Sequence, residues 1–265
     1  MDSEEILSQT LNIVNEARIR GLTLRLAGGA AIRIHSHTFL GLLDRLLEGG
    51  NKSYELKDVD MVTYRSQRED INKLFIDHGF KPDKLVMAYF GDERFMYHQA
   101  EDLYDVDVFF EKMRFSHELD LGPDGKGRLG IDFPTIPPVD LLLEKLQIHE
   151  VSEKDIIDLI VLLRAHTVKG DDSGDSINIQ RIDKVLSSDW GFWFDAKNNL
   201  EETKKTLAKY MQISDLCKDD SDDIQRKIDR ILACISSSPK SSGWLKRSKM
   251  GTKKTWWLDV EELVR

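Results

Sequence analysis

Two aspartates separated by one residue, Asp58 and Asp60, have the spacing that most directly suggests chemistry in this sequence. They lie in a run, residues 57–63, whose branched and apolar residues are typical of a β-strand. Alternate side chains of a strand share a face, so the two carboxylates would lie on one face with Cα atoms roughly 6.5 to 7 Å apart. A divalent cation would relieve their repulsion, and hard oxygen ligands favour Mg²⁺. The alternative is a pair of surface residues on a solvated sheet face.

A second acidic strand is predicted at residues 103–110, where Asp105 and Asp107 alternate with Val106 and Val108. An acidic pair within so apolar a run costs free energy unless another group compensates it. Asp107, with a valine on each side, is the better candidate for a buried carboxylate. Asp105 shares the same face and remains an alternative.

A glycine pair, Gly28-Gly29, follows a predicted strand at residues 22–27 and precedes the small residues Ala30 and Ala31, which can start a helix. Glycines let a backbone approach a ligand closely, and the free N–H groups at a helix N-terminus attract anions such as phosphate. A phosphate site is therefore one interpretation of this turn. The other is a tight turn without a ligand.

The elements that must position these groups form an α+β pattern. We expect helices at residues 2–20 and 33–54, and a third that is capped by Ser66 and Glu69 and ends near Gly79. Strands are expected at residues 85–90 and 94–99, joined as a hairpin by a turn at Gly91-Asp92.

The sequence becomes predominantly helical after Pro137-Pro138. A helix is expected at residues 139–150, and Ser152 with Asp155 forms a capping box for the next helix, which extends to His166. The acidic segment 169–176 is expected to be a solvated linker rather than a metal site. Further helices are predicted at residues 179–187, 198–211 and 222–235. This pattern predicts an α/β domain at residues 1–136, a helical domain at 137–238 and a basic, aromatic tail at 239–265.

Composition excludes several classes of protein. The chain has 265 residues and a net charge of −9, which argues against broad, non-specific nucleic-acid binding. No apolar run is long enough to span a bilayer and the first residues are acidic, so we expect a cytoplasmic protein with no membrane partner. The only cysteines, Cys217 and Cys234, are expected to be reduced thiols.

The tail is a local exception to the acidic charge. Residues 240–258 combine six basic residues up to Lys254 with Trp244, Trp256 and Trp257, and basic residues interleaved with aromatics can bind nucleic acid. We favour the alternative, a hairpin that packs its tryptophans on the helical domain and leaves the lysines in solvent.

Taken in order, the Gly28-Gly29 turn, the Asp58-Val59-Asp60 strand and the Val106-Asp107-Val108 strand resemble the nucleotidyltransferase superfamily. The segment 140–164, with Leu141, Lys145 and the run at 154–159, is similar to the helical segment of abortive-infection (AbiEii-type) toxin nucleotidyltransferases. This resemblance implies a nucleotidyltransferase-like mixed β-sheet with flanking helices, followed by a C-terminal helical domain. Its implied ligands are two Mg²⁺ ions and an NTP.

The resemblance also implies a role for each candidate residue. Asp58, Asp60 and Asp107 would bind the metal ions, and Asp107 would help to accept the proton from the attacking hydroxyl. Gly28 and Gly29 would bind the β- and γ-phosphates through their N–H groups. Lys145 would either add positive charge at the triphosphate or be a solvated helix lysine, and Asp155 and Asp158 are expected to be structural.

The leading hypothesis is a Mg²⁺-dependent nucleotidyltransferase that moves an NMP from an NTP to a hydroxyl of an RNA, a protein or a small molecule. The toxin branch favours tRNA or protein as the acceptor and suggests a cognate antitoxin. The alternative is a catalytically inert nucleotidyltransferase-like binding or regulatory module of toxin-antitoxin type. A third hypothesis is RNA binding led by the tail.

Overall fold

The computed structural model describes residues 2–49, 56–99, 103–213 and 216–258. Within these residues a five-stranded mixed sheet has the order β1-β2-β5-β4-β3. Its strands are β1 (Leu24–Leu26), β2 (Asp58–Thr63), β3 (Lys81–Pro82), β4 (Arg94–His98) and β5 (Asp105–Phe110). Strands β2 and β5 are parallel, and the other neighbouring pairs are antiparallel. The predicted α+β class with a mixed sheet is confirmed.

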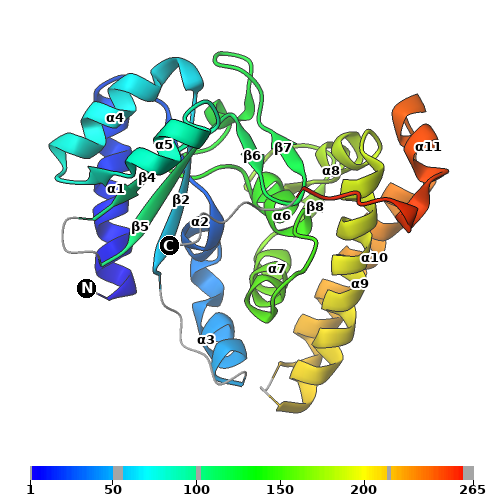
Figure 1. Cartoon of the computed structure of the whole chain (residues 1–265). Helices are drawn as coiled ribbons and strands as arrows, with labels where there is room; N and C mark the ends of the chain where they lie inside the picture. The colour runs from blue at the N-terminus through cyan, green and yellow to red at the C-terminus, as the bar shows by residue number, and fades with distance from the viewer. Residues whose placement is uncertain (1, 50–55, 100–102, 214–215, 259–265) are drawn as a thin grey trace.

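Helices cover both faces of this sheet. Figure 1 shows α1 (Ser3–Ile19) and α4 (Arg68–Asp77) on one side, and α2 (Gly28–His35) and α6 (Pro138–Leu146) on the other. The α1 and α4 side buries the apolar members of the strands, with Tyr97 of β4 stacked on Phe75 of α4 at 4.3 Å between ring centroids. The opposite face, towards α2 and α6, carries the acidic side chains.

The helical part follows the sheet. It consists of α6, α7 (Glu153–Ala165), α8 (Ile179–Leu186), α9 (Trp190–Ile213), α10 (Lys218–Ser237) and α11 (Ser242–Ser248), with the short parallel strands β8 (Val168–Lys169) and β9 (Ile177–Asn178) between α7 and α8. A hairpin of β6 (Lys112–Arg114) and β7 (Glu118–Asp120) precedes it. Buried apolar side chains from α1 to α10 form one continuous core across both parts. The division at residues 136 and 238 stays a prediction.

Local signals explain the confirmed elements. Asp2 caps α1 by accepting from the N–H groups of Glu4 and Glu5, and Ser152 caps α7 with the predicted capping box to Asp155. Strand β2 alternates as predicted, with Val59 and Met61 fully buried. In the part of the chain that is described, no helix has both the length and the apolar character needed to cross a membrane.

Two predicted elements are wrong. The helix expected at 33–54 is broken at Ser36: α2 ends at His35, and a 3₁₀ turn (His37–Phe39) precedes α3 (Leu40–Gly49), while residues 50–55 lie outside the described part. The strand expected at 85–90 is α5 (Lys84–Phe90), so the hairpin at Gly91-Asp92 is absent; Asp83 caps α5 by accepting from the N–H groups of Leu85 and Val86. Strand β4 pairs instead with β3 and β5.

Smaller corrections concern caps and connections. Ser66 does not cap α4: Ser66 lies in a 3₁₀ turn (Arg65–Gln67), and Gln67 precedes the helix without a side-chain cap. The acidic segment 169–176 is not merely solvated, because Asp172 pairs with Arg128 at 2.7 Å and Asp175 with His35 at 2.9 Å.

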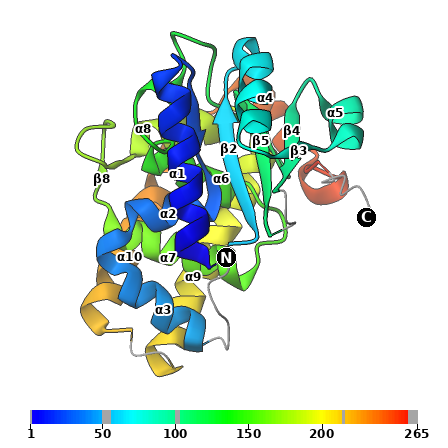
Figure 2. The same cartoon turned by 90° about the vertical axis from the view of Figure 1, so that its left-hand side faces the viewer.

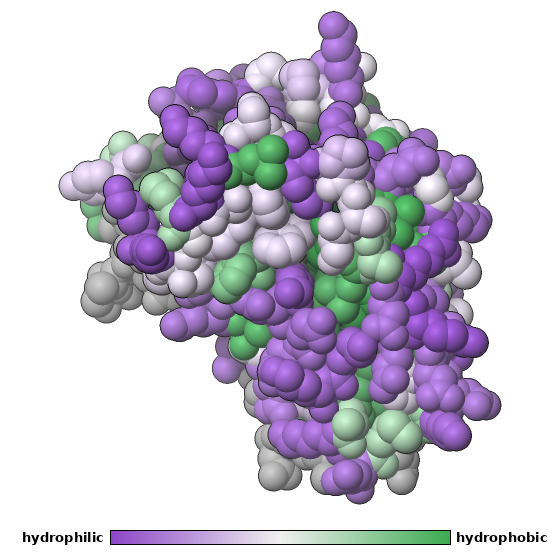
Figure 3. Space-filling model, turned by 90° about the vertical axis from the view of Figure 1, so that its right-hand side faces the viewer, coloured by the Kyte–Doolittle hydropathy of each residue, from purple (hydrophilic) through white to green (hydrophobic). Residues whose placement is uncertain are grey.

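The C-terminal tail packs on α9, as we favoured, but as a helix rather than a hairpin. Trp244 of α11 lies edge-on to Trp193, and Trp256 contacts Trp190 and Phe194, both on α9. The lysines at 246, 249, 253 and 254 are exposed. Figure 3, which faces the side of α9 to α11, shows a mostly hydrophilic surface with small hydrophobic patches. The last seven residues of the predicted tail lie outside the described part.

Candidate active site

The register of β2 on β5 brings the two acidic pairs side by side. Asp58 lies opposite Asp105, and Asp60 lies opposite Asp107. Because alternate residues share a face, all four carboxylates lie on the same face of the sheet, the one towards α2 and α6. Asp58 is exposed and the other three are half-buried. Four acidic groups concentrate negative charge at this face.

Asp107 is paired with a single cation at a long distance. Its nearest cation is Arg94 of β4, whose Nη1 lies 3.5 Å from Oδ1, and that Oδ1 is buried and accepts no hydrogen bond within the described structure. Burial raises the pKa of Asp107 to about 7, and the charges of Asp60 and Asp58 add to the shift against the opposing effect of Arg94. The side chain is therefore poised to take or release a proton near neutral pH.

Asp105, in contrast, is already paired. His98 of β4 contacts it through Nδ1 at 2.7 Å, and the other ring nitrogen of His98 lies 3.1 Å from Asp83. Burial alone would lower the pKa of His98, but the hydrogen bonds to Asp105 and Asp83 raise it. This arrangement favours Asp107 over Asp105 as the third carboxylate of the site.

The glycine turn lies directly against Asp60. The Ala27 N–H donates to the Asp60 carbonyl at 2.8 Å, and Gly28 begins α2 with a φ of +59°. A Cβ placed on Gly28 would lie 2.3 Å from Asp60 Oδ2, so only glycine allows this approach. The predicted proximity of turn and acidic strand is thus present, on the same side of the sheet.

Glu144 of α6 is a further member of this site, absent from the sequence prediction. Its Oε2 accepts the Gly28 N–H at 3.1 Å, and the residue is buried. Burial, with the charge of Asp60, raises the pKa of Glu144 to about 8, and burial also raises the pKa of Asp60. The Gly28 N–H predicted to face a phosphate therefore faces a carboxyl group.

Lys145 is neither solvated nor open to a ligand in this arrangement. Its Nζ lies 2.9 Å from Asp155 and 3.0 Å from Asp158 on α7, so these two carboxylates are structural, as expected. Burial opposes its charge, but Asp158, Asp155 and Glu144 raise the pKa of Lys145 well above its ordinary value. The ammonium also favours the ionised form of Asp60. Its predicted contact with a triphosphate stays a prediction.

The acidic face offers carboxylate oxygens as donor atoms for a metal ion. Carboxylate oxygens suit Mg²⁺, and Oδ1 of Asp107 accepts no hydrogen bond within the described structure. Burial raises the pKa of Asp60, and the charge of Asp58 adds to that shift. Asp58, Asp60 and Asp107 do not, however, bring three ligand atoms within 4.8 Å of one another. Among the described residues only His35, His166 and Asp175 do so. Mg²⁺ at the acidic face would require side-chain rotations.

Two of the missed residues had a weak signal in the sequence. Glu144 stands in the apolar run 139–146, where an acidic residue is expected to need a partner. Arg94, Met96 and His98 are every second residue of a predicted strand, so their side chains share one face. Neither signal identifies the partner, because the two partners, Gly28 and Asp107, lie on α2 and β5.

Comparisons with known proteins add little to this description. No protein-family model matches the sequence, and no curated protein matches it. One solved structure, the crystal structure of an antigenic nucleotidyltransferase-like protein from Paracoccidioides brasiliensis, aligns with 93% of this chain and 99% of its own chain, at 12% identity and a TM-score of 0.42.

Proposed function

We propose that this protein is a Mg²⁺-dependent nucleotidyltransferase that moves an NMP from an NTP to an acceptor hydroxyl. The observation that carries the proposal is the in-register pairing of Asp60 with Asp107, with the Gly28 turn packed against Asp60. A ring of hard oxygen donors beside a helix N-terminus suits a metal-bound triphosphate.

Asp58, Asp60 and Asp107 would hold the metal ions. When bound, Mg²⁺ would offset the charge of these carboxylates and stabilise the attacking and leaving oxygens. In the reaction, a bond forms from the acceptor oxygen to the α-phosphorus while the bond to pyrophosphate breaks. Asp107 would also help to accept the proton of the attacking hydroxyl.

Arg94 and the glycine turn would position the triphosphate. Arg94 is half-buried beside Asp107, and a guanidinium can contact phosphate oxygens through two donors. The Gly28 and Gly29 N–H groups would bind β- and γ-phosphate oxygens once Glu144 gives up its hydrogen bond to Gly28. Lys145 would act on the site as a nearby positive charge.

The proposed acceptor is based on the resemblance of the segment 140–164 to AbiEii-type toxin nucleotidyltransferases. A tRNA or a protein hydroxyl is the proposed target, and a cognate antitoxin is the proposed partner. A small-molecule hydroxyl is the remaining acceptor class.

The test uses α-labelled NTPs with Mg²⁺ and total cellular RNA or protein as acceptors. We expect the wild type to label an acceptor, and Asp58→Ala and Asp60→Ala each to reduce labelling by at least about 100-fold. Loss of a residue that only hydrogen-bonds to a metal ligand already lowers affinity or activity by about 10- to 100-fold. Asp70→Ala, which removes an exposed carboxylate from α4, is the matched control and should label normally. Equal labelling by the wild type and the Asp58 and Asp60 variants would refute the proposed enzymatic activity.

An inert nucleotide-binding or regulatory module is the second candidate, and one observation favours it. Glu144 accepts a hydrogen bond from the Gly28 N–H, and Asp155 and Asp158 form ion pairs with Lys145. Two groups that were predicted to contact phosphate therefore already have partners within the chain. Melting with and without Mg²⁺ and NTP separates the two candidates, because a ligand that binds the folded state raises Tm. A Tm rise without any labelled acceptor would indicate a binding module, and no Tm change would argue against both.

A further inference from the structure

A second cluster of potential metal ligands lies away from the acidic face. It comprises His35 at the end of α2, His166 at the C-cap of α7 and Asp175 in the turn between β8 and β9. One ligand atom from each of the three lies within 4.8 Å of the others. The end of α2 thus meets the segment that follows α7, more than a hundred residues further along the chain.

Both histidines direct the same ring nitrogen to one carboxylate. His35 Nδ1 lies 2.9 Å from Asp175 Oδ1, and His166 Nδ1 lies 3.5 Å from Asp175 Oδ2. The His166 ring also stands edge-on to the His35 ring, with 5.4 Å between centroids. His166 Nδ1 also lies 2.9 Å from the backbone carbonyl oxygen of Asp175, a hydrogen bond that a metal ion at this nitrogen would replace. The two Nδ1 atoms and the Asp175 carboxylate lie close together.

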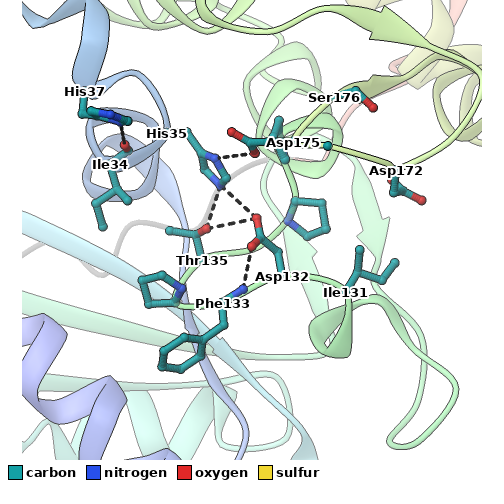
Figure 4. Close-up of a pocket in the computed structure, with 14 residues that line it drawn as sticks. Ile34, His35, His37, Ile131, Asp132, Phe133, Thr135, Asp172, Asp175 and Ser176 are labelled. Atoms are coloured by element: carbon teal, nitrogen blue, oxygen red, sulfur yellow. Dashed lines mark hydrogen bonds and ion pairs between the residues drawn. The ribbon is translucent and has the colours of Figure 1, made fainter.

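The other nitrogen of His35 has a supporting set of oxygens. Nε2 lies 2.7 Å from Thr135 Oγ1 and 3.2 Å from Asp132 Oδ2, as the dashed lines in Figure 4 show. A metal-bound histidine commonly donates its second N–H to a carboxylate or hydroxyl, which fixes its tautomer and ring orientation. Thr135 and Asp132 therefore provide the support that an Nδ1-bound metal needs.

Burial and access also suit a bound ion. The side chains of His35 and His166 are 7% and 3% exposed, whereas that of Asp175 is 51% exposed. His35 and Asp175 line a cavity of about 460 Å³, which gives an ion access to the buried nitrogens (Figure 4). His166 Nε2 is buried without a hydrogen-bond partner in the described structure, so the present contacts do not satisfy this ring.

We propose that His35, His166 and Asp175 bind a transition metal ion, with Zn²⁺ as the best match. Two imidazole nitrogens and one carboxylate oxygen are typical Zn²⁺ ligands, whereas Mg²⁺ prefers oxygen alone. At Zn²⁺ bond lengths of about 2.0 to 2.2 Å, ligand atoms stand about 3.3 Å apart, which lies between the present nitrogen–oxygen distances of 2.9 and 3.5 Å. Three protein ligands would leave a fourth position for water or another ligand.

The site would connect α2, α7 and the β8–β9 turn. Because α2 starts at Gly28, an ion that fixes its far end would hold the helix beside Asp60. The proposal is independent of nucleotidyl transfer, since it uses none of the acidic-face residues. Its competitor is a metal-free ion triad, in which Asp132 and Asp175 raise the pKa of His35 to about 9 against the effect of burial.

The test is a calorimetric titration of the chelator-treated full chain with ZnCl₂, repeated with MgCl₂. We expect one Zn²⁺ per chain, a rise in Tm with Zn²⁺, and no competition from Mg²⁺. Replacement by Co²⁺ should give the intense visible absorption of a four-coordinate site. Absence of Zn²⁺ binding, or of the Co²⁺ spectrum, would establish the metal-free triad instead.

Substitution of the proposed ligands tests whether the ion binds at this cluster. Asp175→Asn keeps the shape of the side chain and tolerates the φ of +56° at this position, so the turn should survive while Zn²⁺ affinity falls at least about 10-fold. His166→Ala should lower affinity further. His37→Ala is the matched control, because His37 points away from the cluster towards Ile34 (Figure 4). Unchanged affinity in Asp175→Asn and His166→Ala would overturn the proposal.

Two further controls exclude other sites. Asp58→Ala should bind Zn²⁺ as the wild type does, which separates this site from the acidic face. Cys217→Ser should also bind normally, since the exposed thiol of Cys217 is another potential zinc ligand. Loss of binding in either variant would place the ion elsewhere and contradict the assignment.

Discussion

Gly28 and Asp60 lie so close together that the identity of one residue controls the geometry of the other. Gly28 combines a φ of +59° with a potential Cβ position 2.3 Å from Asp60 Oδ2. A side chain there is opposed both by backbone strain and by a steric clash with the carboxylate. Gly21 has a similar φ of +75° but no neighbour within 4 Å of its potential Cβ. Comparison of substitutions at the two glycines therefore separates the cost of backbone strain from the cost of the steric clash.

Gly28→Ala should lower the free energy of unfolding by about 2 to 4 kcal/mol, the sum of the left-handed backbone cost and a displaced Asp60. Gly21→Ala should lower it by only about 1 to 2 kcal/mol, because it carries the backbone cost alone. Urea unfolding of both variants measures the difference. Equal losses in the two variants would show that Asp60 can move away freely.

Glu144 should make stability depend on pH. Its pKa is about 8 in the folded chain and lies at its ordinary value of 4.5 when unfolded. Between these values the folded state holds a proton that the unfolded state has released, so stability falls as pH rises, by at most about 1.4 kcal/mol per pH unit. Below 4.5 the contribution is constant, and above 8 the loss is complete.

Glu144→Gln should remove this dependence, because the amide keeps the shape of the side chain and does not ionise. We expect the variant to gain stability relative to wild type as pH rises from 5 to 8, measured by urea unfolding at several pH values. Glu69→Gln, an exposed change on α4, is the control and should follow the wild-type curve. Parallel curves for wild type and Glu144→Gln would contradict the raised pKa.

At the scale of elements, helices with explicit caps and strands with clear alternation could be predicted. Asp2 and Ser152 mark the starts of α1 and α7, and the alternation of Asp and Val marks β2 and β5. Such signals are local, so the sequence contains them in full. Boundaries were less predictable, since α9 starts at Trp190 and not at residue 198.

The two mispredicted elements failed for different reasons. The apolar run at 85–90 has no clear period, and Asp83 caps it as a helix, a local signal that the sequence contains. At the break after α2, His35 contacts Thr135 and Asp175, which lie 100 residues or more further on. Such tertiary contacts are absent from the local sequence pattern.

The candidate site was predictable to a similar extent. The shared face of Asp58 and Asp60 and the preference for Asp107 follow from strand geometry and flanking valines, whereas the grouping of Gly28 with them was implied by the family resemblance. Glu144 and the Arg94 contact do not, because α6 and β4 reach Asp60 and Asp107 only in the folded chain. The cluster of His35, His166 and Asp175 has no sequence motif at all.

At the scale of the whole molecule, one buried carboxylate joins the tail to the helical part. Asp195 of α9 is 3% exposed and accepts from His117 Nε2 at 2.8 Å and Trp256 Nε1 at 3.0 Å, while His149 Nδ1 lies 3.1 Å away. Trp257 stacks on the His149 ring with 3.8 Å between centroids. The tail is thus fixed by both hydrogen bonds and aromatic packing, and its lysines at 246, 249, 253 and 254 are exposed.

Asp195→Ala should therefore release the tail and destabilise the chain. Two imidazoles and an indole N–H would lose a buried acceptor, which is expected to lower the free energy of unfolding by about 3 kcal/mol. Trp256→Phe keeps the ring contacts with α9 and loses one hydrogen bond, so its cost should be about 1 kcal/mol. Limited proteolysis should cut the tail faster in Asp195→Ala than in Trp256→Phe. Asp229→Ala, which removes an exposed partner of Lys204, should change stability by less than about 0.5 kcal/mol, and a similar small effect in Asp195→Ala would show that packing alone holds the tail.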